Sequence, residues 1–410
     1  MTTHSEQRPH TSRQSSFQRF FLSLWYRSPL NRHLLSYFLL PLSYLLNGIA
    51  SLRRCIQSAK ANPLPVPIVV VGNLSVGGTG KTPVVIALVK ALQEKGFKVG
   101  VISRGYGSQA PHYPFAISAD TPVKQSGDEA LLIAQTSDCP VVLDKDRQAA
   151  AQHLIKTYPN TQVIISDDGL QHYRLPRQLE LVVVDGERGF GNGLCIPAGP
   201  LREKANRLAS VNWVLINGRP QHDSLQGSFL KDRFLKNSFS KKSDAQTPEQ
   251  EVIHLQPRQW RNIKTGQILD LEILPWNLIT SNITKNNVNK SNLINSSLTN
   301  SNLLEQDLLE QGLTEKNVNI TALAAIGNPE RFFHTLRALA PEEKINTIAF
   351  DDHHAFSEQD FNEISNEEIV LMTAKDAVKC RGFARENWWA LEVSLSLPSE
   401  LLDDIVQCVH

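Results

Sequence analysis

The feature that most constrains this chain is a glycine-rich segment that follows an apolar run, IVVVGNLSVGGTGKTP at residues 68–83. This is the order of a phosphate-binding loop, in which glycines let backbone N–H groups face an anion. In such a loop Lys81 contacts the β- and γ-phosphates of a nucleotide, and the Thr82 hydroxyl binds Mg²⁺. A helix expected over residues 82–93 adds its positive N-terminus. The chain departs from the strict pattern at Ser75, where glycine is usual, and the simpler alternative is a glycine-rich turn. The predicted ATP-binding residues are Gly77, Gly78, Thr79, Gly80, Lys81 and Thr82.

Apolar runs alternate with helical segments on both sides of the chain's midpoint. The expected strands of the first run are 98–103, 141–143, 162–166, 179–184 and 211–216, with a helix at 144–156. The expected strands of the second run are 320–326, 345–350, 369–373 and 388–397, with a helix at 329–339. Continuous apolar strands that alternate with helices indicate a parallel sheet covered on both faces. We therefore predict an α/β fold with two α/β/α lobes, the first of the P-loop NTPase type, and a site in the cleft between them.

Length and composition divide the chain into four parts, since 410 residues exceed one ordinary core. The expected parts are an N-terminal arm at 1–64, a nucleotide-binding domain at 65–220, a connecting segment at 221–319 and a C-terminal lobe at 320–410. Within the connecting segment, nine of the 26 residues at 277–302 are asparagine. Such a stretch buries too little apolar surface to offset its ordering entropy, so we interpret it as a mobile insertion.

Charge and cysteine usage exclude several classes of protein. The net charge is +1, which gives no argument for a nucleic-acid partner. The five cysteines are scattered, with neither a C-x-x-C pair nor metal-binding spacing, as is typical of a reducing compartment. The charge is uneven, however: residues 1–60 carry +7 and the remainder −6. No protein partner can be predicted from these features.

The arm contains 19 uncharged residues at 34–52, LLSYFLLPLSYLLNGIASL, with arginines on both sides. As one helix it would span roughly 28 Å, close to the hydrocarbon thickness of a bilayer. Pro41 and several polar residues weaken a transmembrane interpretation, and basic residues flank both ends. An apolar, tyrosine-containing helix with arginines suits the interface of an anionic membrane. The alternatives are a true span and a helical hairpin buried on the protein's own core.

Acidic residues and histidines follow or precede several of the expected strands and helices. Asp167 and Asp168 follow the apolar strand QVIIS, and adjacent carboxylates at such a position suggest a metal, although Asp-Gly is also turn chemistry. Asp128 and Glu129 begin a helix, where acids are favoured as helix caps. His353 follows a strand of the second lobe. A carboxylate from one lobe that meets a histidine from the other would form a base when the cleft closes.

The whole series of motifs resembles the tetraacyldisaccharide 4′-kinases of lipid A biosynthesis. The matching segments are VVGNLSVGGTGKTP (70–83), SRGYG (103–107), GDE (127–129), SDDGLQH (166–172), PAGPLRE (197–203), IGNPERFF (326–333), DDHHAF (351–356) and TAKDAVKC (373–380). The resemblance implies transfer of the ATP γ-phosphate to the 4′-hydroxyl of a lipid A disaccharide precursor, with Mg²⁺. It also implies an N-terminal membrane-binding helix, attachment to an anionic membrane surface, and a location at the cytoplasmic face of a Gram-negative inner membrane, peripheral or through a single helix.

The resemblance also implies roles for individual residues. Asp128 is expected to be the catalytic base with His353 as its partner, while Thr82, Glu129, Asp167 and Asp168 surround the metal. The residues expected to hold the lipid's sugar and phosphate are Tyr106, Arg147, Gln171, His172 and Arg202. The chain departs from the family pattern at Asp351, where proline is common, at Ala374, where glutamate is common, and in its Asn-rich insertion.

Two other classes share parts of this pattern. A membrane-associated ATPase switch of the partitioning type also combines a GG-x-GK[ST] loop with an amphipathic helix. Such switches carry a lysine directly before the two glycines, where this chain has Val76. A small-molecule kinase or ligase with the same loop would not explain the apolar arm.

Overall fold

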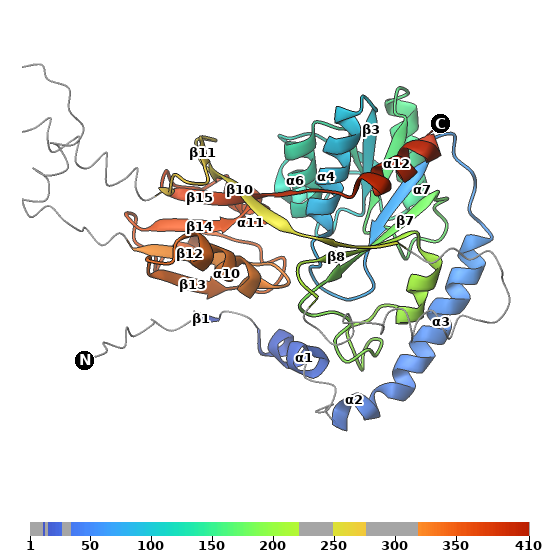
Figure 1. The fold of residues 1–410 in the computed structure, drawn as a ribbon, viewed down its shortest axis with the longest axis horizontal. Coiled ribbons are helices and arrows are strands. Elements are labelled where there is room, and N and C mark those ends of the chain that lie inside the picture. Colours follow the sequence, from blue (N-terminus) through green and yellow to red (C-terminus); the bar gives the residue numbers. More distant parts are fainter. Residues whose placement is uncertain (1–10, 13–14, 27–33, 221–248, 276–318, 410) are drawn as a thin grey trace, which may run out of the picture.

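The computed structural model describes residues 11–12, 15–26, 34–220, 249–275 and 319–409. The Asn-rich segment at 277–302 lies outside the described residues. The described chain forms two α/β lobes that lie side by side, with the helices of the N-terminal arm along one side (Figure 1). The prediction of an α/β fold with two sheets is confirmed.

The first lobe is built on a mostly parallel sheet. Among the described residues its strand order is β4-β5-β3-β6-β2-β7-β8-β9, with only β4 antiparallel to its neighbour. Its strands are β2 (Ile68–Gly72), β3 (Val99–Ser103), β4 (Phe115–Ile117), β5 (Val141–Leu143), β6 (Val163–Asp167), β7 (Leu179–Asp185), β8 (Trp213–Asn217) and β9 (Glu249–Ile253). Its helices are α4 (Lys81–Glu94), α5 (Val123–Ser126), α6 (Asp128–Ser137) and α7 (Arg147–Thr157), with a 3₁₀ turn η2 (Ala205–Ser210). Strands β2, β3, β5, β6, β7 and β8 are buried throughout, as expected of a sheet covered on both faces.

The second lobe has a mixed sheet, whose order in the described chain is β1-β13-β12-β14-β15-β10-β11. Its strands are β1 (Thr11–Ser12), β10 (Leu255–Asn262), β11 (Ile268–Asp270), β12 (Ile320–Ala324), β13 (Ile345–Ala349), β14 (Ile369–Thr373) and β15 (Trp388–Leu395). Helices α10 (Pro329–Leu339) and α11 (Ala374–Cys380) and a 3₁₀ turn η6 (Glu358–Phe361) complete it. The expected strands at 320–326, 345–350 and 369–373 are confirmed as parallel neighbours.

The chain crosses between the lobes more often than the sequence suggested. Residues 249–270, which the sequence assigned to a connection, form β9 in the first sheet and β10 and β11 in the second. Helix α12 (Ser399–Val409) follows β15 but returns to the first lobe, where Leu401 and Ile405 join the core around α4. Figure 1 shows both crossings, β9 to β10 and β15 to α12, between the two lobes. Within the described residues, the chain therefore passes between the lobes at two places after β8, from β9 to β10 and from β15 to α12.

The N-terminal arm forms three helices on the surface of the first lobe: α1 (Ser16–Tyr26), α2 (Leu34–Phe38) and α3 (Leu40–Ser58). Pro41 lies in the first turn of α3, where a missing N–H costs nothing, so the apolar segment begins a second helix instead of continuing the first. Within the described residues, no helix is both long enough and apolar enough to cross a bilayer. Asp351, where the family commonly has proline, accepts a hydrogen bond from the backbone N–H of Ser15, just before α1 (2.9 Å).

Helix α3 turns a polar side toward the protein and an apolar side outward. Ser43 is 4% exposed; its hydroxyl donates to the Cys195 carbonyl (2.9 Å) and accepts from the Ala198 N–H (3.1 Å). The exposed large apolar side chains of α3 are Leu42, Tyr44, Leu45, Leu46, Ile49, Leu52 and Ile56. The alternative of a helical hairpin buried on the protein's own core is therefore wrong, because the apolar side chains face solvent.

Candidate active site

The predicted phosphate loop connects β2 to α4 at the edge of the first sheet that faces the second lobe. Gly80 directly precedes α4 with φ of +90°, and a Cβ there would lie 2.2 Å from Nδ2 of Asn217. The same amide donates to the Thr79 carbonyl (3.0 Å). Lys81 and Thr82 begin α4 and are 9% and 7% exposed. The end of β8 thus holds the loop in a shape that only glycine at position 80 permits.

Ser75, the departure from the strict loop pattern, has a structural partner in the segment that carries PAGPLRE. Ser75 forms an isolated antiparallel bridge with Leu201, and the Val76 N–H donates to the Pro200 carbonyl (2.8 Å). The Asn73 amide also donates to the Ser75 carbonyl (2.7 Å). The first half of the loop is therefore fixed by neighbouring backbone and not by the conformational freedom of a glycine.

Asp168 joins the loop lysine to an arginine of the PAGPLRE segment. Its carboxylate lies 3.5 Å from Lys81 Nζ, and Arg202 Nη1 donates to both of its oxygens at 3.1 Å. Burial alone would raise the pKa of Asp168, but Lys81 and Arg202 lower it well below its usual range. Asp168 has φ of +48°, a conformation that non-glycine residues rarely adopt and that is concentrated at functional sites.

Asp167, the last residue of β6, presents an unsatisfied oxygen. It is 1% exposed, its Oδ2 accepts from the Ser103 hydroxyl (3.3 Å), and its Oδ1 has no hydrogen-bond partner among the residues that the structure describes. Burial and the negative charges of Glu129 and Asp168 raise the pKa of Asp167. A buried carboxylate that is short of positive charge is a suitable neighbour for a cation.

The two lobes meet through Asp128 and His353, 225 positions apart in sequence. His353 Nδ1 lies 3.1 Å from Asp128 Oδ2 and 3.3 Å from Oδ1. His353 has φ of +62°, and its ring lies 4.8 Å from that of Tyr106. Burial would raise the pKa of Asp128, but the hydrogen bond with His353 and the charges of Lys375 and Lys379 lower it to about 2. Asp128 is therefore ionised at neutral pH and can accept a proton.

Two lysines of α11 complete this cluster, and the sequence analysis assigned them no role. Lys375 Nζ lies 2.9 Å from Glu129 Oε1, 3.9 Å from Asp128 and 3.3 Å from His353 Nε2. Lys379 Nζ lies 3.9 Å from Asp128 and 2.8 Å from Asp376. The signal was present in TAKDAVKC, where two lysines four residues apart share one helix face directly after a strand. Their contact with α6 could not be foreseen without the arrangement of the lobes.

Glu129 lies between the loop and α11. Its burial would raise its pKa, but Lys375 and Lys81 lower it. Ala374, where the family commonly has glutamate, packs its methyl group against the apolar cluster of Leu131, Leu132 and Val378. With alanine at position 374, the positive charges that act on Glu129 are those of Lys375, Lys81 and His353.

The residues predicted to hold the lipid's sugar and phosphate do not all lie together. Tyr106 is 61% exposed beside His353. The Gln171 amide accepts from Arg202 (3.3 Å) and donates to Glu203 (3.0 Å). Tyr106 thus lies beside the Asp128–His353 pair, while Arg202, with Gln171, lies beside Asp168, the partner of Lys81. All three side chains remain candidates for contact with an acceptor.

Arg147 lies where a lipid could not contact it, in contrast to the prediction. It is 1% exposed, and it donates to the carbonyl oxygens of Asp144 (2.7 Å) and Asp167 (2.9 Å). Burial lowers the pKa of Arg147 to about 10. Because its guanidinium holds the backbone at the end of β6, we interpret Arg147 as a positioning residue for the Asp167–Asp168 turn.

His172 makes the stability of the protein depend on pH. Burial, aided by the charge of Arg147, lowers the pKa of His172 from 6.5 to about 4. Above pH 6.5 the imidazole is neutral in both states, so its contribution is fully present there. As the pH falls from 6.5 to about 4, the unfolded chain gains a proton that the folded one lacks, and stability is lost. We expect the free energy of unfolding in urea to fall less between pH 7.5 and pH 5 in His172→Gln than in the wild type; equal falls would contradict the assignment.

The second lobe also contacts the loop through its backbone and through Arg331. A Cβ on Gly327 would lie 2.2 Å from the N–H nitrogen of Gly78, so the two backbones approach too closely for a side chain. Arg331 Nη2 donates to Asn217 Oδ1 (2.9 Å), the amide that holds the Thr79 carbonyl. The motif IGNPERFF therefore reaches the phosphate loop from the opposite lobe.

Comparisons with known proteins found a matching family model and similar solved structures. The family model described as "LpxK: Tetraacyldisaccharide-1-P 4′-kinase" matches residues 35–410. The crystal structure of LpxK from Aquifex aeolicus in complex with ATP is similar over 92% of this chain and 100% of that chain, with 23% identity and a TM-score of 0.60. The signal recognition particle receptor FtsY from Elizabethkingia anophelis covers 51% of this chain and 70% of its own, with 15% identity and a TM-score of 0.27, a likeness too weak to carry an argument.

Proposed function

Because the chain belongs to the tetraacyldisaccharide-1-P 4′-kinase family, we infer that it transfers the γ-phosphate of ATP to the 4′-hydroxyl of a tetraacyldisaccharide 1-phosphate. The products are lipid IVA and ADP, and the reaction belongs to lipid A biosynthesis. The observation that carries this inference is the pair Asp128–His353, a base and its partner from opposite lobes, next to Glu129, whose pKa is lowered by the loop lysine Lys81 as well as by Lys375.

Asp128 is suited to accept the proton of the acceptor hydroxyl. As the 4′-oxygen bonds to the γ-phosphorus and the bond to the β-phosphate oxygen breaks, Asp128 accepts the hydroxyl proton and ADP leaves. His353 keeps the carboxylate oriented through its Nδ1 contact of 3.1 Å. Phosphoryl transfer depends on positioning and charge neutralisation more than on covalent chemistry, so this pair needs only to hold and receive a proton.

The negative charge on the transferred phosphoryl group requires Lys81 and a bound metal, which the residues around it would hold. Bound Mg²⁺ would neutralise charge on the β- and γ-phosphates. Within the described residues, no three His, Cys, Asp or Glu side chains stand ready to hold a metal by themselves. Magnesium sites in kinases use one or two carboxylates together with the substrate's phosphates. Thr82, Asp168, Glu129 and the unsatisfied Oδ1 of Asp167 fit that requirement.

A kinase and an ATPase switch differ in what they do without an acceptor. With γ-labelled ATP, we expect the label to move to the lipid only when an acylated disaccharide 1-phosphate is supplied, and ADP formation to be slow in its absence. A partitioning-type switch would release labelled inorganic phosphate irrespective of the acceptor. A kinase or ligase of small molecules would leave the disaccharide unlabelled, and either result would contradict the inference.

We further propose that the protein binds the cytoplasmic face of the inner membrane peripherally, through the arm. The support is the outward apolar side of α3 together with the +7 charge of residues 1–60. A helix with such a side buries it in the boundary between headgroups and acyl chains, while basic residues are attracted to anionic lipids. This location brings the cleft to a substrate whose acyl chains stay in the bilayer.

The outward leucines allow a direct test of attachment. Leu45 and Leu52 are 61% and 63% exposed, so replacing both with serine removes apolar surface without opening a cavity in the core. We expect the double variant to bind phosphatidylcholine vesicles at least on the order of 100-fold more weakly, since each of the two leucines contributes about 1.5–3 kcal/mol when buried. Val393→Ser, at a residue of β15 that is 40% exposed, is the control and should bind as the wild type does. Unchanged sedimentation of the double variant with vesicles would rule out attachment through α3.

A further inference from the structure

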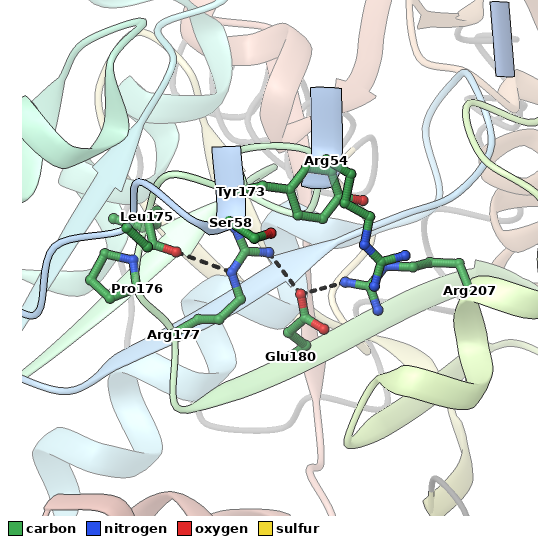
Figure 2. A pocket seen from close by; sticks show the side chains of 9 residues that line it. Arg54, Ser58, Tyr173, Leu175, Pro176, Arg177, Glu180 and Arg207 are labelled. Atoms are coloured by element: carbon green, nitrogen blue, oxygen red, sulfur yellow. Dashed lines mark hydrogen bonds and ion pairs between the residues drawn. The ribbon is translucent and has the colours of Figure 1, made fainter. Parts of the chain in front are cut away.

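A hollow of about 280 Å³ lies beside the C-terminal end of α3, on the first lobe. Its lining residues are Arg54, Ser58, Ala61, Tyr173, Leu175, Pro176, Arg177, Glu180 and Arg207. None of them is among the residues assigned above to the nucleotide, the metal or the acceptor. Figure 2 shows the guanidinium groups of Arg54, Arg177 and Arg207 gathered around Tyr173 and Glu180.

The hollow carries an excess of positive charge. Glu180 accepts from Arg177 (2.7 Å) and from Arg207, and Arg207 Nε also lies 4.0 Å from the Glu203 carboxylate. Among the described residues, no carboxylate pairs with Arg54, whose Nη2 lies 3.4 Å from the Ser210 hydroxyl. Three guanidinium groups against the carboxylates of Glu180 and Glu203 leave one positive charge uncompensated. The carbonyl end of α3 opposes an anion by about half an elementary charge, which is less than that.

The ring of Tyr173 lies against all three cations, and its hydroxyl donates to Glu203. The guanidinium carbons of Arg54, Arg177 and Arg207 lie 5.2, 5.4 and 5.9 Å from the ring centroid. The N–H donors of Arg177 and Arg207 are occupied by Glu180, the Ser210 hydroxyl and backbone carbonyl oxygens. Among the described residues, Arg54 donates to the Ser210 hydroxyl alone, so its fork keeps donors for a ligand. The planar fork of an arginine matches the oxygens of a phosphate group.

The position of the hollow on α3 indicates where its ligand comes from. Arg54 lies eleven residues after Ser43, three helical turns, and so shares the inward side of α3. Leu52 and Ile56, its neighbours in sequence, are exposed on the outer side. A helix that buries its outer side at the boundary of the acyl chains sets its inner side at the depth of the headgroups.

We propose that this hollow binds the phosphate of an anionic phospholipid in the membrane to which α3 attaches. Arg54 supplies the uncompensated charge, Arg177 and Arg207 flank it, and Leu175 and Pro176 offer apolar wall to the glycerol. The site would select an anionic leaflet and fix the orientation of the first lobe on it. It rests on the proposed attachment of the arm, and not on phosphoryl transfer.

The test compares two adjacent arginines of α3 that differ in where they lie. Arg54 lines the hollow and is half-buried, whereas Arg53 is exposed and does not line it. Arg54→Gln and Arg53→Gln lose the same charge, and sedimentation is measured with phosphatidylcholine vesicles with and without phosphatidylglycerol. We expect Arg53→Gln to lose about fivefold of the binding to anionic vesicles, the share of one arginine near a charged surface. Arg54→Gln should lose at least about tenfold, because charge-assisted hydrogen bonds are lost as well.

The outcomes separate this inference from its premises. If both variants lose the same amount, the attraction is diffuse and the inference is overturned. It is also overturned if Arg54→Gln weakens binding only to vesicles that carry the acylated disaccharide 1-phosphate and not to those with phosphatidylglycerol, since the ligand is then the acceptor itself. A wild-type protein that binds no vesicle would refute the attachment of α3, while label transfer to the acceptor in neutral detergent tests the kinase separately.

Discussion

Replacing Asp128 with asparagine is expected to lower kcat on the order of 10² to 10⁴-fold, the usual contribution of a positioned general base. The substitution keeps the size of the side chain but removes the charge that accepts the acceptor's proton. Because the pKa of Asp128 is held at about 2, the wild-type carboxylate is ionised throughout the neutral range, and the loss should be seen at every pH tested there. Initial rates of lipid phosphorylation measure it.

The KM for ATP distinguishes a lost base from a lost fold in this variant. Apart from a hydrogen bond from the Glu129 N–H, the Asp128 carboxylate contacts His353, Lys375 and Lys379 of the second lobe, and the phosphate loop keeps its own contacts. We therefore expect the KM for ATP to change little. Asp120→Asn, at an exposed residue of the same lobe, is the matched control and should behave as the wild type. Near-normal turnover by Asp128→Asn would remove Asp128 from the role of base.

The phosphate loop could be predicted from the sequence because its determinants are local. Strand, glycines, lysine and helix follow one another within residues 68–94, and each contributes through its own backbone or side chain. The same holds for the buried strands of the first sheet, whose continuous apolar runs have no other interpretation in an α/β chain.

The two strands with polar faces, β9 and β10, were not predicted from the sequence. β9 reads EQEVI and is exposed along most of its length, as befits a strand at the edge of the first sheet. β10 contains Pro257, where its register with β15 shifts, and its first five side chains alternate between exposed and partly buried before the buried Trp260 and Asn262. Neither pattern shows the apolar run by which the other strands were recognised, and proline argues against a strand interior.

Contacts between the lobes could be foreseen only as possibilities. Asp128 and His353 each lie at the end of a regular element, so a meeting was conceivable, but 225 intervening positions gave no distance. The lysines of α11 were missed because their partners lie on α6, and nothing in TAKDAVKC shows which helix it packs against. The lipid contact expected of Arg147 came from the family resemblance alone, and it does not fit a guanidinium that two backbone carbonyls occupy.

Replacing Lys81 with methionine should weaken both the binding of ATP and the transfer of its γ-phosphate. Methionine keeps the length and apolar stem of lysine but removes the ammonium, so the loop can fold while the phosphates lose their point charge. We expect kcat/KM for ATP to fall on the order of 10² to 10³-fold, the range for losing one donor aimed at developing charge. Both a higher KM and a lower kcat should appear, because Lys81 faces the nucleotide in the ground state and in the transition state.

Two further substitutions make the Lys81 result specific. Lys95→Met, just past the other end of α4, removes the same charge from an exposed ion pair with Asp403 and should leave the kinetics unchanged. Lys81→Arg restores the charge, yet we expect little recovery, because Lys81 is 9% exposed and a guanidinium is too broad for the space that the ammonium fills. Loss of Lys81 also leaves Asp168 with Arg202 as its remaining cation at ion-pair distance among the described residues. If Lys81→Met kept both ATP affinity and turnover, the loop would not be the phosphate site, and the assignment of Asp168 beside it would fail as well.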